Sequence, residues 1–421
     1  MSPEAAKVPV TVEGRTLVLS NLAKVLYPET GFTKAAVIDY YQRIAPVLLP
    51  HIADRPLTLK RYPDGVTREF FYQKEAPAQR PDWVPTVRVP GSGRHKDTIR
   101  HVTIGDLPTL IWAANLADLE IHTPMWRHPH VGRPDLLVFD LDPGPPAGIA
   151  DCCTVALLLR TLLAGLGLNP LAKTSGGKGM QLLAAISGLT SGQASDLARS
   201  LAENLERNNP GRVTSRMAKP LRRGKVFIDW SQNNAAKTTV APYSLRAMRT
   251  PTVSTPVTWD EVSEGRADLG FTSEQALERV AASGDLLAPL LAPGPRVTWR
   301  PVPRLLRRLT GAGRGTEENE HHAGTQRQRT ARRRGRAGAA PADLPCALRH
   351  AGRAVRRDHV PAPGSAGPAG RVALLGGRCG RADRAHGAGR LGWPHRAGAR
   401  HRHRRLRAGG GAGARVRDPQ A

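Results

Sequence analysis

Apolar and polar residues follow two different periods along the first 300 residues of the chain. Apolar positions three and four residues apart indicate helices, and short apolar runs bounded by Pro, Gly or charged residues indicate strands. We expect helices at 33–49, 106–119, 151–166 and 191–207, with Thr33 and Asp106 as capping residues and Asp151 at the start of the third helix. We expect strands at 136–142, from 171 to 173, at 180–186 and at 225–230. This order of elements predicts an α+β or mixed α/β fold.

The strand expected at 136–142 ends in a pair of aspartates, Asp140 and Asp142, which Pro143 and Gly144 follow. Residues two apart on a strand point to the same face, so both carboxylates project together. Their charges repel unless a cation neutralises them or one carboxyl keeps its proton. A hard divalent ion such as Mg²⁺ or Mn²⁺ takes oxygen ligands of this kind. The pair is therefore a candidate cation site, although strand-end carboxylates also cap turns and helices.

A second candidate is the turn Lys-Thr-Ser-Gly-Gly-Lys-Gly at 173–179, between two expected strands. Glycines let backbone N–H groups approach a phosphate closely, and Lys173 and Lys178 add positive charge. The turn is not a Walker A loop, because Ala172 stands where that motif needs its first glycine and Gly179 where it needs Ser or Thr. The alternative is a hairpin with only a structural role.

Asp229 ends the strand expected at 225–230 and is a candidate third ligand of the cation site, although a lone aspartate there is more often a cap. A basic loop precedes this strand and contains Arg216, Lys219, Arg222, Arg223 and Lys225. Three carboxylates, a phosphate-binding turn and many basic residues fit a two-metal nucleotidyltransferase. In that chemistry, ions about 4 Å apart activate an attacking hydroxyl and stabilise the departing pyrophosphate.

The formal charge of +27 is distributed unevenly over the 421 residues. Residues 311–421 contain 24 arginines, no lysine and seven acidic residues, which gives them +17 and leaves +10 for the residues before them. The basic front part favours a polyanionic partner such as nucleic acid. The Arg-, Gly-, Ala- and Pro-rich tail at 301–421 lacks helix or strand periodicity, so we expect it to be disordered. It is either a basic arm that binds nucleic acid or the translation of a shifted reading frame, and the abrupt loss of lysine favours the second.

The three motifs together resemble the primase-polymerases of the archaeo-eukaryotic primase superfamily, specifically the polymerase domain of bacterial ligase D and its stand-alone relatives. The likeness extends from about Leu19 to about Leu290, and the motifs stand here as Asp140-Leu141-Asp142, Ser175-Gly176-Gly177-Lys178-Gly179 and Asp229-Trp230-Ser231-Gln232-Asn233. The resemblance implies a primase-type α+β fold in residues 1–300, in which an RRM-like catalytic sheet packs beside an N-terminal αβ module. It also implies a Mn²⁺- or Mg²⁺-dependent two-metal polymerase that fills gaps during non-homologous end joining, with a preference for ribonucleotides.

Residue by residue, the resemblance makes Asp140, Asp142 and Asp229 the catalytic metal ligands. The residues that would bind the nucleoside triphosphate are Lys60, His122, Ser175, Gly176, Lys178, Arg222, Gln232 and Arg246. Those that would hold the 5′-phosphate of gapped DNA are Asn21, Lys24 and Lys34. Phe70 and Phe71 would stack on template bases, which suits any base, with core packing as the alternative for one of them. The partners implied by analogy are gapped or broken DNA, NTP or dNTP substrates, Ku and a DNA ligase.

Two positions depart from the family pattern. The second motif often continues with a histidine where Gln181 stands, and Ala23 replaces an acidic residue that is common before Lys24. Gln181 can exchange hydrogen bonds, but it cannot titrate. No lysine follows Lys237, so the chain as given lacks the lysine nucleophile of a C-terminal ATP-dependent ligase.

Two other functions stay open on the sequence. Residues 139–144 resemble the opening motif of haloacid-dehalogenase-type phosphatases, whose first aspartate is a nucleophile. Here the motif comes late in the chain, Gly144 stands where Thr or Val is usual, and no convincing later acidic pair follows. The other alternative is a non-catalytic DNA-end-binding protein, which would lose nothing when Asp140 or Asp142 is replaced.

Four cysteines, Cys152, Cys153, Cys346 and Cys379, lack metal-binding spacing, and the adjacent pair lies in an apolar helical stretch. We expect them to be core residues in a reduced compartment. The N-terminus has no apolar signal region, and no stretch approaches about 18 apolar residues. These features predict a cytoplasmic, nucleoid-associated protein without a membrane partner.

Overall fold

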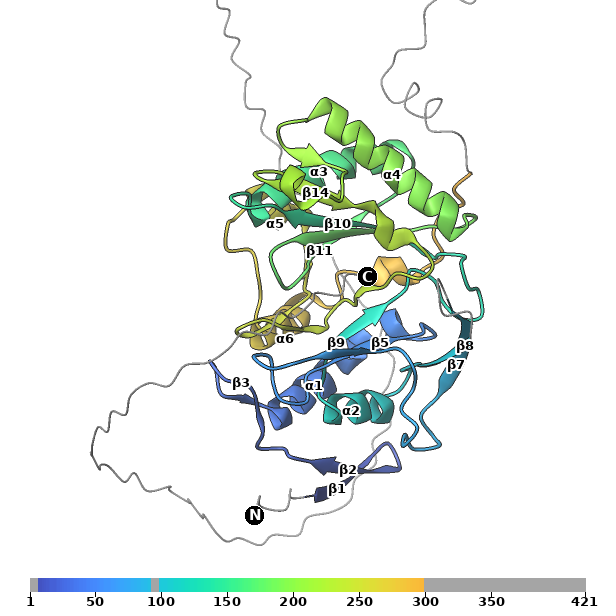
Figure 1. Cartoon of the computed structure of the whole chain (residues 1–421), viewed down its shortest axis with the longest axis vertical. Coiled ribbons are helices and arrows are strands. Elements are labelled where there is room, and N and C mark those ends of the chain that lie inside the picture. The colour runs from blue at the N-terminus through green and yellow to red at the C-terminus, as the bar shows by residue number, and fades with distance from the viewer. Residues whose placement is uncertain (1–6, 92–97, 299–421) are drawn as a thin grey trace, which may run out of the picture. The chain divides into compact units, whose positions relative to one another are not determined.

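The structure of the chain is a computed structural model that describes residues 7–91 and 98–298. The tail expected at 301–421, with Cys346 and Cys379, lies outside the described residues. In the described part, two larger β-sheets and the helices packed on them form the fold (Figure 1).

The pair Asp140 and Asp142 lies on the central region of a six-stranded sheet with the strand order β13-β14-β10-β12-β11-β18. Its strands are β10 (Leu136–Pro143), β11 (Leu171–Thr174), β12 (Met180–Ala185), β13 (Val213–Thr214), β14 (Val226–Asp229) and β18 (Pro256–Val257). Neighbouring strands are antiparallel, except that β13 and β14 are parallel. With two long helices, the chain follows the path β10-α3-β11-β12-α4-β14, in which the two-residue strand β13 and the short helix η1 precede β14.

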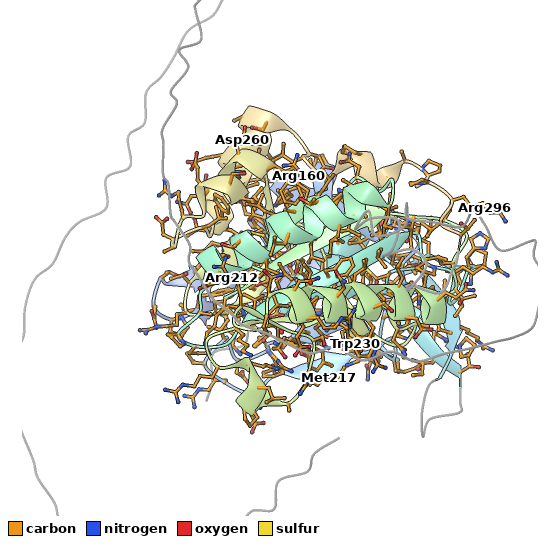
Figure 2. All side chains as sticks on the ribbon, turned by 90° about the horizontal axis from the view of Figure 1, so that it is seen from above. Arg160, Arg212, Met217, Trp230, Asp260 and Arg296 are labelled. Atoms are coloured by element: carbon orange, nitrogen blue, oxygen red, sulfur yellow. The ribbon has the colours of Figure 1, made fainter. Side chains whose placement is uncertain are left out.

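The helices α3 (Ile149–Gly165) and α4 (Ser191–Asn208) pack on one face of this sheet. Leu137, Phe139 and Leu141 of β10 belong to the same buried cluster as apolar residues of both helices. Because side chains alternate along a strand, Asp140 and Asp142 point to the opposite face. Figure 2 looks onto the helical face. The apolar alternation of β10 therefore directs both carboxylates away from the helices.

The second sheet has four strands in the order β15-β9-β5-β6 and lies in the lower half of Figure 1. Its strands are β5 (Thr58–Arg61), β6 (Phe71–Gln73), β9 (Asp118–Thr123) and β15 (Thr239–Val240). A separate buried cluster unites this sheet with α1 (Lys34–Ile52) and α2 (Leu107–Asn115). Since β15 comes from the second half of the chain, this module is not purely N-terminal.

Short strand pairs and helices complete the described part. The pairs are β1 (Lys7–Val12) with β2 (Arg15–Ser20), β3 (Val25–Tyr27) with β4 (Phe32–Thr33), β7 (Thr86–Pro90) with β8 (Thr98–Val102), and β16 (Leu245–Ala247) with β17 (Pro251–Val253). The further helices are α5 (Trp259–Glu264), α6 (Ser273–Ser283) and the 3₁₀ helices η1 (Lys219–Arg222), η2 (Trp230–Asn233) and η3 (Ala288–Leu291).

The expected strands and the first and last expected helices are confirmed to within a few residues, and two details are wrong. The second expected helix ends at Asn115, because Ala117 has a φ of +57° and β9 begins at Asp118. The third begins at Ile149 and not at Asp151, with Gly148 as its N-cap. Asp151 instead accepts a hydrogen bond from the Gly148 N–H at 2.9 Å from inside the first turn.

Cys152 and Cys153 are free thiols in the core of the six-stranded sheet, as predicted. Burial raises the pKa of both thiols, which suppresses the reactive thiolate form. None of the helices in the described ranges has the length and apolar character needed to span a bilayer.

Candidate active site

Four polar residues lie side by side across four neighbouring strands of the six-stranded sheet. Asp140 of β10 is paired directly with Asp229 of β14 on one side and with Gln181 of β12 on the other. Gln181 is in turn paired with Lys173 of β11. Directly paired residues share one face of a sheet, and Asp142 lies on the same face two residues along β10. The strand register thus brings the three aspartates of the sequence motifs together.

The two carboxylates of β10 repel each other. Burial raises the pKa of Asp140, and the charge of Asp142 raises it further. Asp142 is more exposed than Asp140. Partial burial raises the pKa of Asp142, and the charge of Asp229 raises it further. Asp140 accepts a hydrogen bond from Gln181 Nε2 at 3.1 Å, whereas the described ranges show neither a hydrogen bond nor an ion pair to Asp142. A divalent cation would relieve this repulsion.

The donor set suits Mg²⁺ or Mn²⁺, because all three candidate ligands are carboxylates. Within residues 7–91 and 98–298, however, no group of three His, Cys, Asp or Glu side chains is already arranged around a common metal position. Asp140, Asp142 and Asp229 therefore share a face and a register without forming a finished coordination shell.

Asp229 is held more firmly than the other two aspartates, because it caps η2. Its Oδ1 accepts hydrogen bonds from the N–H of Ser231 at 3.0 Å and from Ser231 Oγ at 2.6 Å. Its Oδ2 accepts one from Gln232 Nε2 at 2.9 Å. Asp229 therefore has the capping role that the sequence suggested, and it also lies directly opposite Asp140. Gln232 keeps a buried Oε1 without a partner in the described part of the chain.

The glycine-rich turn after β11 packs closely on β10. Ser175 Oγ accepts a hydrogen bond from the N–H of Gly179 at 3.2 Å, and a Cβ on Gly179 would collide with the carbonyl oxygen of Leu141. Gly176 has a φ of +68°, which favours glycine. Lys178 is exposed in the turn. The structural role of the glycines is therefore clear, and the turn still presents one free-standing lysine side chain to solvent.

Lys173 differs from Lys178, and its expected part in the positive charge of the turn is wrong. It is fully buried and donates hydrogen bonds to Gln181 Oε1 at 2.6 Å, Ser254 Oγ at 2.6 Å and the carbonyl of Val240 at 3.1 Å. An ammonium group has three hydrogens, so these acceptors use all of them. Lys173 is thus unable to contact a phosphate in this arrangement.

Glu120, which the sequence analysis missed, joins three of the residues expected to bind the nucleotide. It is buried on β9 and lies 3.4 Å from Lys60 Nζ, 3.0 Å from His122 Nε2 and 3.3 Å from Arg246 Nε. Lys60 is its cross-strand partner, and His122 lies two residues along the same strand and hence on the same face. The order Glu-Ile-His at 120–122 on a strand was the available signal for this cluster.

The charges in this cluster favour an anionic ligand. Burial alone raises the pKa of Glu120, but the hydrogen bond from His122 and the charges of Arg246, His122 and Lys60 outweigh it and hold the pKa below its usual range. Burial lowers the pKa of His122, against the effect of Glu120. One carboxylate therefore faces two basic side chains, Lys60 and Arg246. The remaining positive charge suits a triphosphate.

Arg246 links the cluster to the aspartates, and Arg222 acts on the aspartates from another element. Arg246 lies on β16 and also donates a hydrogen bond to the carbonyl of Ser175 in the glycine-rich turn. Arg222 ends η1, with its guanidinium carbon 3.7 Å from the centre of the Phe227 ring. Both arginines act to lower the pKa of Asp142, although the effects that raise it are larger. The residues expected to bind the nucleotide thus border the carboxylates from two directions.

Phe70 and Phe71 are 48% and 44% exposed, so core packing is wrong for both. Lys60 Nζ lies 4.3 Å from the centre of the Phe70 ring, and the Arg61 guanidinium carbon lies 5.1 Å from that of Phe71. Tyr72, which the sequence analysis missed, is 55% exposed and extends this surface. Exposed rings beside cations are suited to stack on nucleic acid bases and to contact the backbone phosphates.

Asn21, Lys24 and Lys34 also lie together, around β3 and at the start of α1, and not on the six-stranded sheet. The N–H of Lys24 donates to the Asn21 carbonyl at 2.9 Å, and that of Lys34 to the Lys24 carbonyl at 2.8 Å. The buried Lys34 Nζ donates to the carbonyl of Ser20 at 2.7 Å. Burial, followed by the charge of Lys24, lowers the pKa of Lys34 to about 8.

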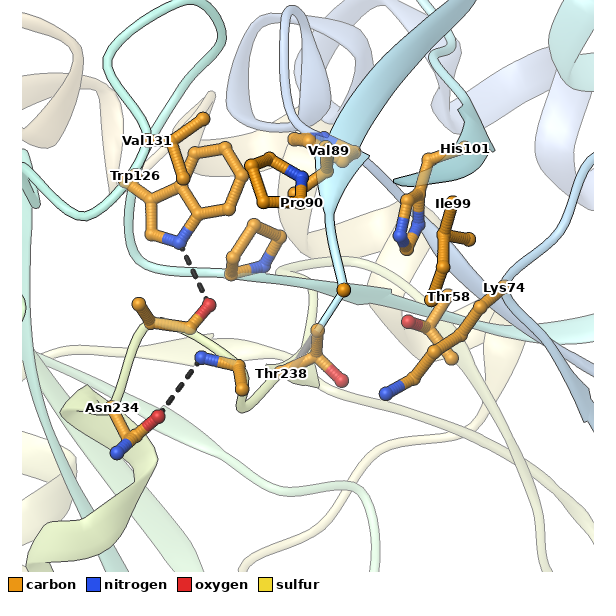
Figure 3. A pocket seen from close by; sticks show the side chains of 15 residues that line it. Thr58, Lys74, Val89, Pro90, Ile99, His101, Trp126, Val131, Asn234 and Thr238 are labelled. Carbon is orange, nitrogen blue, oxygen red and sulfur yellow. Dashed lines mark hydrogen bonds between the residues drawn. The ribbon is translucent and has the colours of Figure 1, made fainter. Parts of the chain in front are cut away.

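A cavity of about 300 Å³ contains none of the site residues expected from the sequence (Figure 3). Its lining includes Trp126, Val89 and His101. The indole N–H of Trp126 donates a hydrogen bond to the carbonyl of Ala235. Thr58 Oγ1 is buried there without a partner among the described residues. This lining has no carboxylate to hold a metal ion, so the polar surface around Asp140 is the better candidate for catalysis.

Comparisons with known proteins agree with the motifs. Residues 33–287 match the family model described as the primase-polymerase domain of LigD. The chain is 44% identical over 324 residues to the multifunctional non-homologous end joining protein LigD of Mycolicibacterium smegmatis. It is 30% identical over 270 residues to the bifunctional LigD of Bacillus subtilis. These alignments cover 72% and 64% of this chain but 42% and 43% of the relatives, so the chain spans less than half of their length.

Among solved structures, the chain is similar to the polymerase domain of Mycobacterium tuberculosis ligase D in complex with DNA. The TM-score is 0.62 and the sequence identity 42%, and the alignment covers 66% of this chain and 99% of that one. These comparisons favour neither a haloacid-dehalogenase-type phosphatase nor a non-catalytic DNA-end-binding protein.

Proposed function

Because this chain belongs to the family of LigD primase-polymerase domains, we propose that it is a metal-dependent nucleotidyltransferase that extends DNA 3′ ends during non-homologous end joining. The observation that carries the proposal is the register that places Asp140 beside Asp229, with Asp142 on the same face. Apart from the two-residue strand β13 and the short helix η1, the path β10-α3-β11-β12-α4-β14 supports an RRM-like catalytic sheet within a primase-type fold. We assign this domain to residues 1–300 and leave residues 301–421 as a separate tail.

Asp140, Asp142 and Asp229 would hold the catalytic ions, Mn²⁺ or Mg²⁺. When bound, these ions supply the charge that activates the 3′-hydroxyl and offsets the leaving pyrophosphate. The chain itself supplies position: the cap at η2 fixes Asp229, and Gln181 holds one oxygen of Asp140. The raised pKa values of Asp140 and Asp142 mean that cation binding must also displace any proton they keep.

The incoming nucleotide would lie between the aspartates and the cluster around Glu120. Lys60, Arg222, Arg246 and Lys178 would offset the triphosphate charge, because phosphate oxygens accept hydrogen bonds from such cations. The remaining contacts that we assign to the nucleotide are His122, Ser175, Gly176 and Gln232. The unpartnered Oε1 of Gln232 supports a contact with a donor group of the substrate. We expect ribonucleotides to be preferred, as the family resemblance implies.

The DNA substrate would be a gapped or broken duplex with a 5′-phosphate. Asn21, Lys24 and Lys34 would hold this phosphate, and Phe70 and Phe71 would stack on template bases. Joining of the filled ends would require a DNA ligase, and we propose a ligase and Ku as further partners. The cytoplasmic nucleoid is the compartment that this function requires.

Primer extension on a duplex with a short gap and a 5′-phosphate tests this function. We expect Mn²⁺-dependent incorporation directed by the template, faster with ribonucleotides than with deoxyribonucleotides. A parallel assay with a phosphomonoester substrate serves as the control for phosphatase activity. Phosphate release without incorporation, or DNA binding without either reaction, would contradict the proposal.

A further inference from the structure

The buried amide of Gln181 connects a lysine to a candidate metal ligand. Its Oε1 accepts a hydrogen bond from Lys173 Nζ at 2.6 Å, and its Nε2 donates one to Asp140 Oδ1 at 3.1 Å. Gln181 is 3% exposed and Lys173 is fully buried. The three residues are consecutive cross-strand partners on β11, β12 and β10, so the strand register itself aligns them.

Lys173 fixes the direction in which this amide points. A protonated lysine donates hydrogen bonds and accepts none, so the carbonyl end of Gln181 must face it. The NH₂ end then faces Asp140, whose carboxylate only accepts when ionised. In the flipped orientation, an NH₂ group would face the ammonium and a carbonyl oxygen would face the carboxylate. While Lys173 and Asp140 are both charged, both contacts would be repulsive, which favours the orientation seen in the structure.

Lys173 is itself held by the rest of the fold. Its other two hydrogens are donated to Ser254 Oγ at 2.6 Å and to the carbonyl of Val240 at 3.1 Å. Val240 lies on β15 of the four-stranded sheet, where it is paired with His122. One ammonium group thus connects the strand next to His122 with the row of residues that contains Asp140. A buried lysine without such acceptors would be costly.

We propose that Lys173 and Gln181 are positioning residues of the metal site, with Lys173 acting through Gln181. Lys173 orients the amide, and the amide N–H holds one oxygen of Asp140 so that the carboxylate presents its other oxygen to the cation. A neutral glutamine performs this task here where the family motif often has histidine. The inference rests on the proposed function, and cation binding tests it separately from polymerase activity.

The experiment measures Mn²⁺ affinity of the full chain, without nucleotide or DNA, from the electron paramagnetic resonance signal of free Mn²⁺. Gln181→Met and Lys173→Met should each weaken the affinity by about tenfold, the lower end of the effect of residues that support metal ligands. If Lys173 acts through Gln181, the double variant should be no weaker than either single variant. Additive losses, near a hundredfold in the double variant, would overturn the proposal.

Two further variants separate positioning from general structural damage. Ser254→Ala removes an acceptor of Lys173 but leaves its contact with Gln181, so the Mn²⁺ affinity should stay within about twofold of the parent. Gln181→His keeps a ring N–H that can face Asp140 and should retain most of the affinity. Thermal unfolding and binding to gapped DNA are measured on each variant.

If Lys173→Met does not fold, the comparison of Gln181→Met with Gln181→His decides the question. Equal Mn²⁺ affinities in these two variants would overturn the proposal, because the N–H donor would then be irrelevant. If the parent chain itself binds no Mn²⁺, the proposed function is contradicted. This result differs from the one that overturns the positioning role of Gln181, so the two proposals can be tested separately.

Discussion

Asp140 of β10 and Asp229 of β14 are directly paired residues on neighbouring antiparallel strands. Paired carboxylates on one face of a sheet destabilise it unless their charge is offset. Asp229 is stabilised by the hydrogen bonds of its capping role, whereas the side chain of Asp140 has one hydrogen bond within the described ranges and a raised pKa. The repulsion among the neighbouring carboxylates therefore destabilises Asp140 most.

The variant Asp140→Asn should be more stable than the parent in the absence of metal at pH 8. Burial and the charges of Asp142 and Asp229 raise the pKa of Asp140, so its contribution to stability is complete at acid pH and is lost as the pH rises through the raised value. Asparagine removes this loss and keeps an acceptor for Gln181. The melting temperature should rise by about 2–4 °C for each kcal/mol of repulsion relieved.

Differential scanning fluorimetry at pH 5 and pH 8, with and without Mn²⁺, measures this effect. The difference between Asp140→Asn and the parent should shrink at pH 5, and Mn²⁺ should stabilise the parent more than the variant. A metal-free variant that melts below the parent at pH 8 would contradict the assignment of repulsion to this row.

Glu120→Gln should destabilise the protein. The substitution removes the buried charge that faces Lys60 and Arg246, and breaking a buried ion pair from one side costs about 3–5 kcal/mol. The KM for nucleotide should rise as well, because both cations lose their fixed position. The matched control is Glu29→Gln, whose exposed pair with Arg249 should be worth about 1 kcal/mol or less. Equal melting temperatures of the two variants would refute the central role of Glu120.

The preference for a 5′-phosphate over a 5′-hydroxyl should decline as the pH rises above about 8. Lys34 must be protonated to bind phosphate, and burial lowers its pKa to about 8 in the free protein. Below that pH the lysine is already charged, so the preference should be flat. Above it, binding must also take up a proton, and the preference should fall by up to about tenfold per pH unit.

Fluorescence anisotropy with matched gapped duplexes from pH 6.5 to 9.5 measures the preference for the phosphate. Lys34→Arg keeps its charge at every pH in this range, so any preference it retains should not vary with pH. Lys34→Gln should lose most of the preference for the phosphate, apart from what Asn21 and Lys24 contribute. A decline of the same size in Lys34→Gln and in the parent would rule out this lysine as the phosphate ligand.

Replacement of Phe70 or Phe71 by alanine should weaken DNA binding without unfolding the protein. Stacking contributes about 1–3 kcal/mol per base, and both rings are nearly half exposed. Affinity for gapped DNA should therefore fall by roughly five- to 150-fold, while the melting temperature changes little. Val18→Ala, at another exposed apolar residue, is the control for nonspecific surface effects. Equal losses of affinity at Val18 and at the phenylalanines would count against stacking.

Much of the site could be predicted because the relevant residues end apolar runs. Asp140 and Asp229 each follow buried strand residues, so their strands and their exposed face were readable from the local pattern. The pairing of these two strands was not readable, since register depends on contacts between distant parts of the chain. The family resemblance supplied that connection.

Glu120 and Lys173 show what local patterns leave out. Glu120 gains its role from Lys60 and Arg246, which lie far away in the sequence and reach it only in the folded sheet. Lys173 lies beside the glycine-rich motif and suggested phosphate binding, but its strand turns it into the protein interior towards Gln181. The end of α2 was predicted too late in the chain. Ala117 has a positive φ, which usually falls on glycine, so nothing in the sequence indicated that the helix ends there.

The most direct test of the whole account is single-turnover addition of one ribonucleotide to a gapped duplex with Mn²⁺, comparing Asp142→Asn with the parent. Asparagine preserves the shape of the side chain but removes the charge that would bind the ion. We predict a loss of rate of about a thousandfold, equivalent to about 4 kcal/mol, with unchanged affinity for the gapped DNA. An unchanged rate in Asp142→Asn would contradict the metal-dependent mechanism.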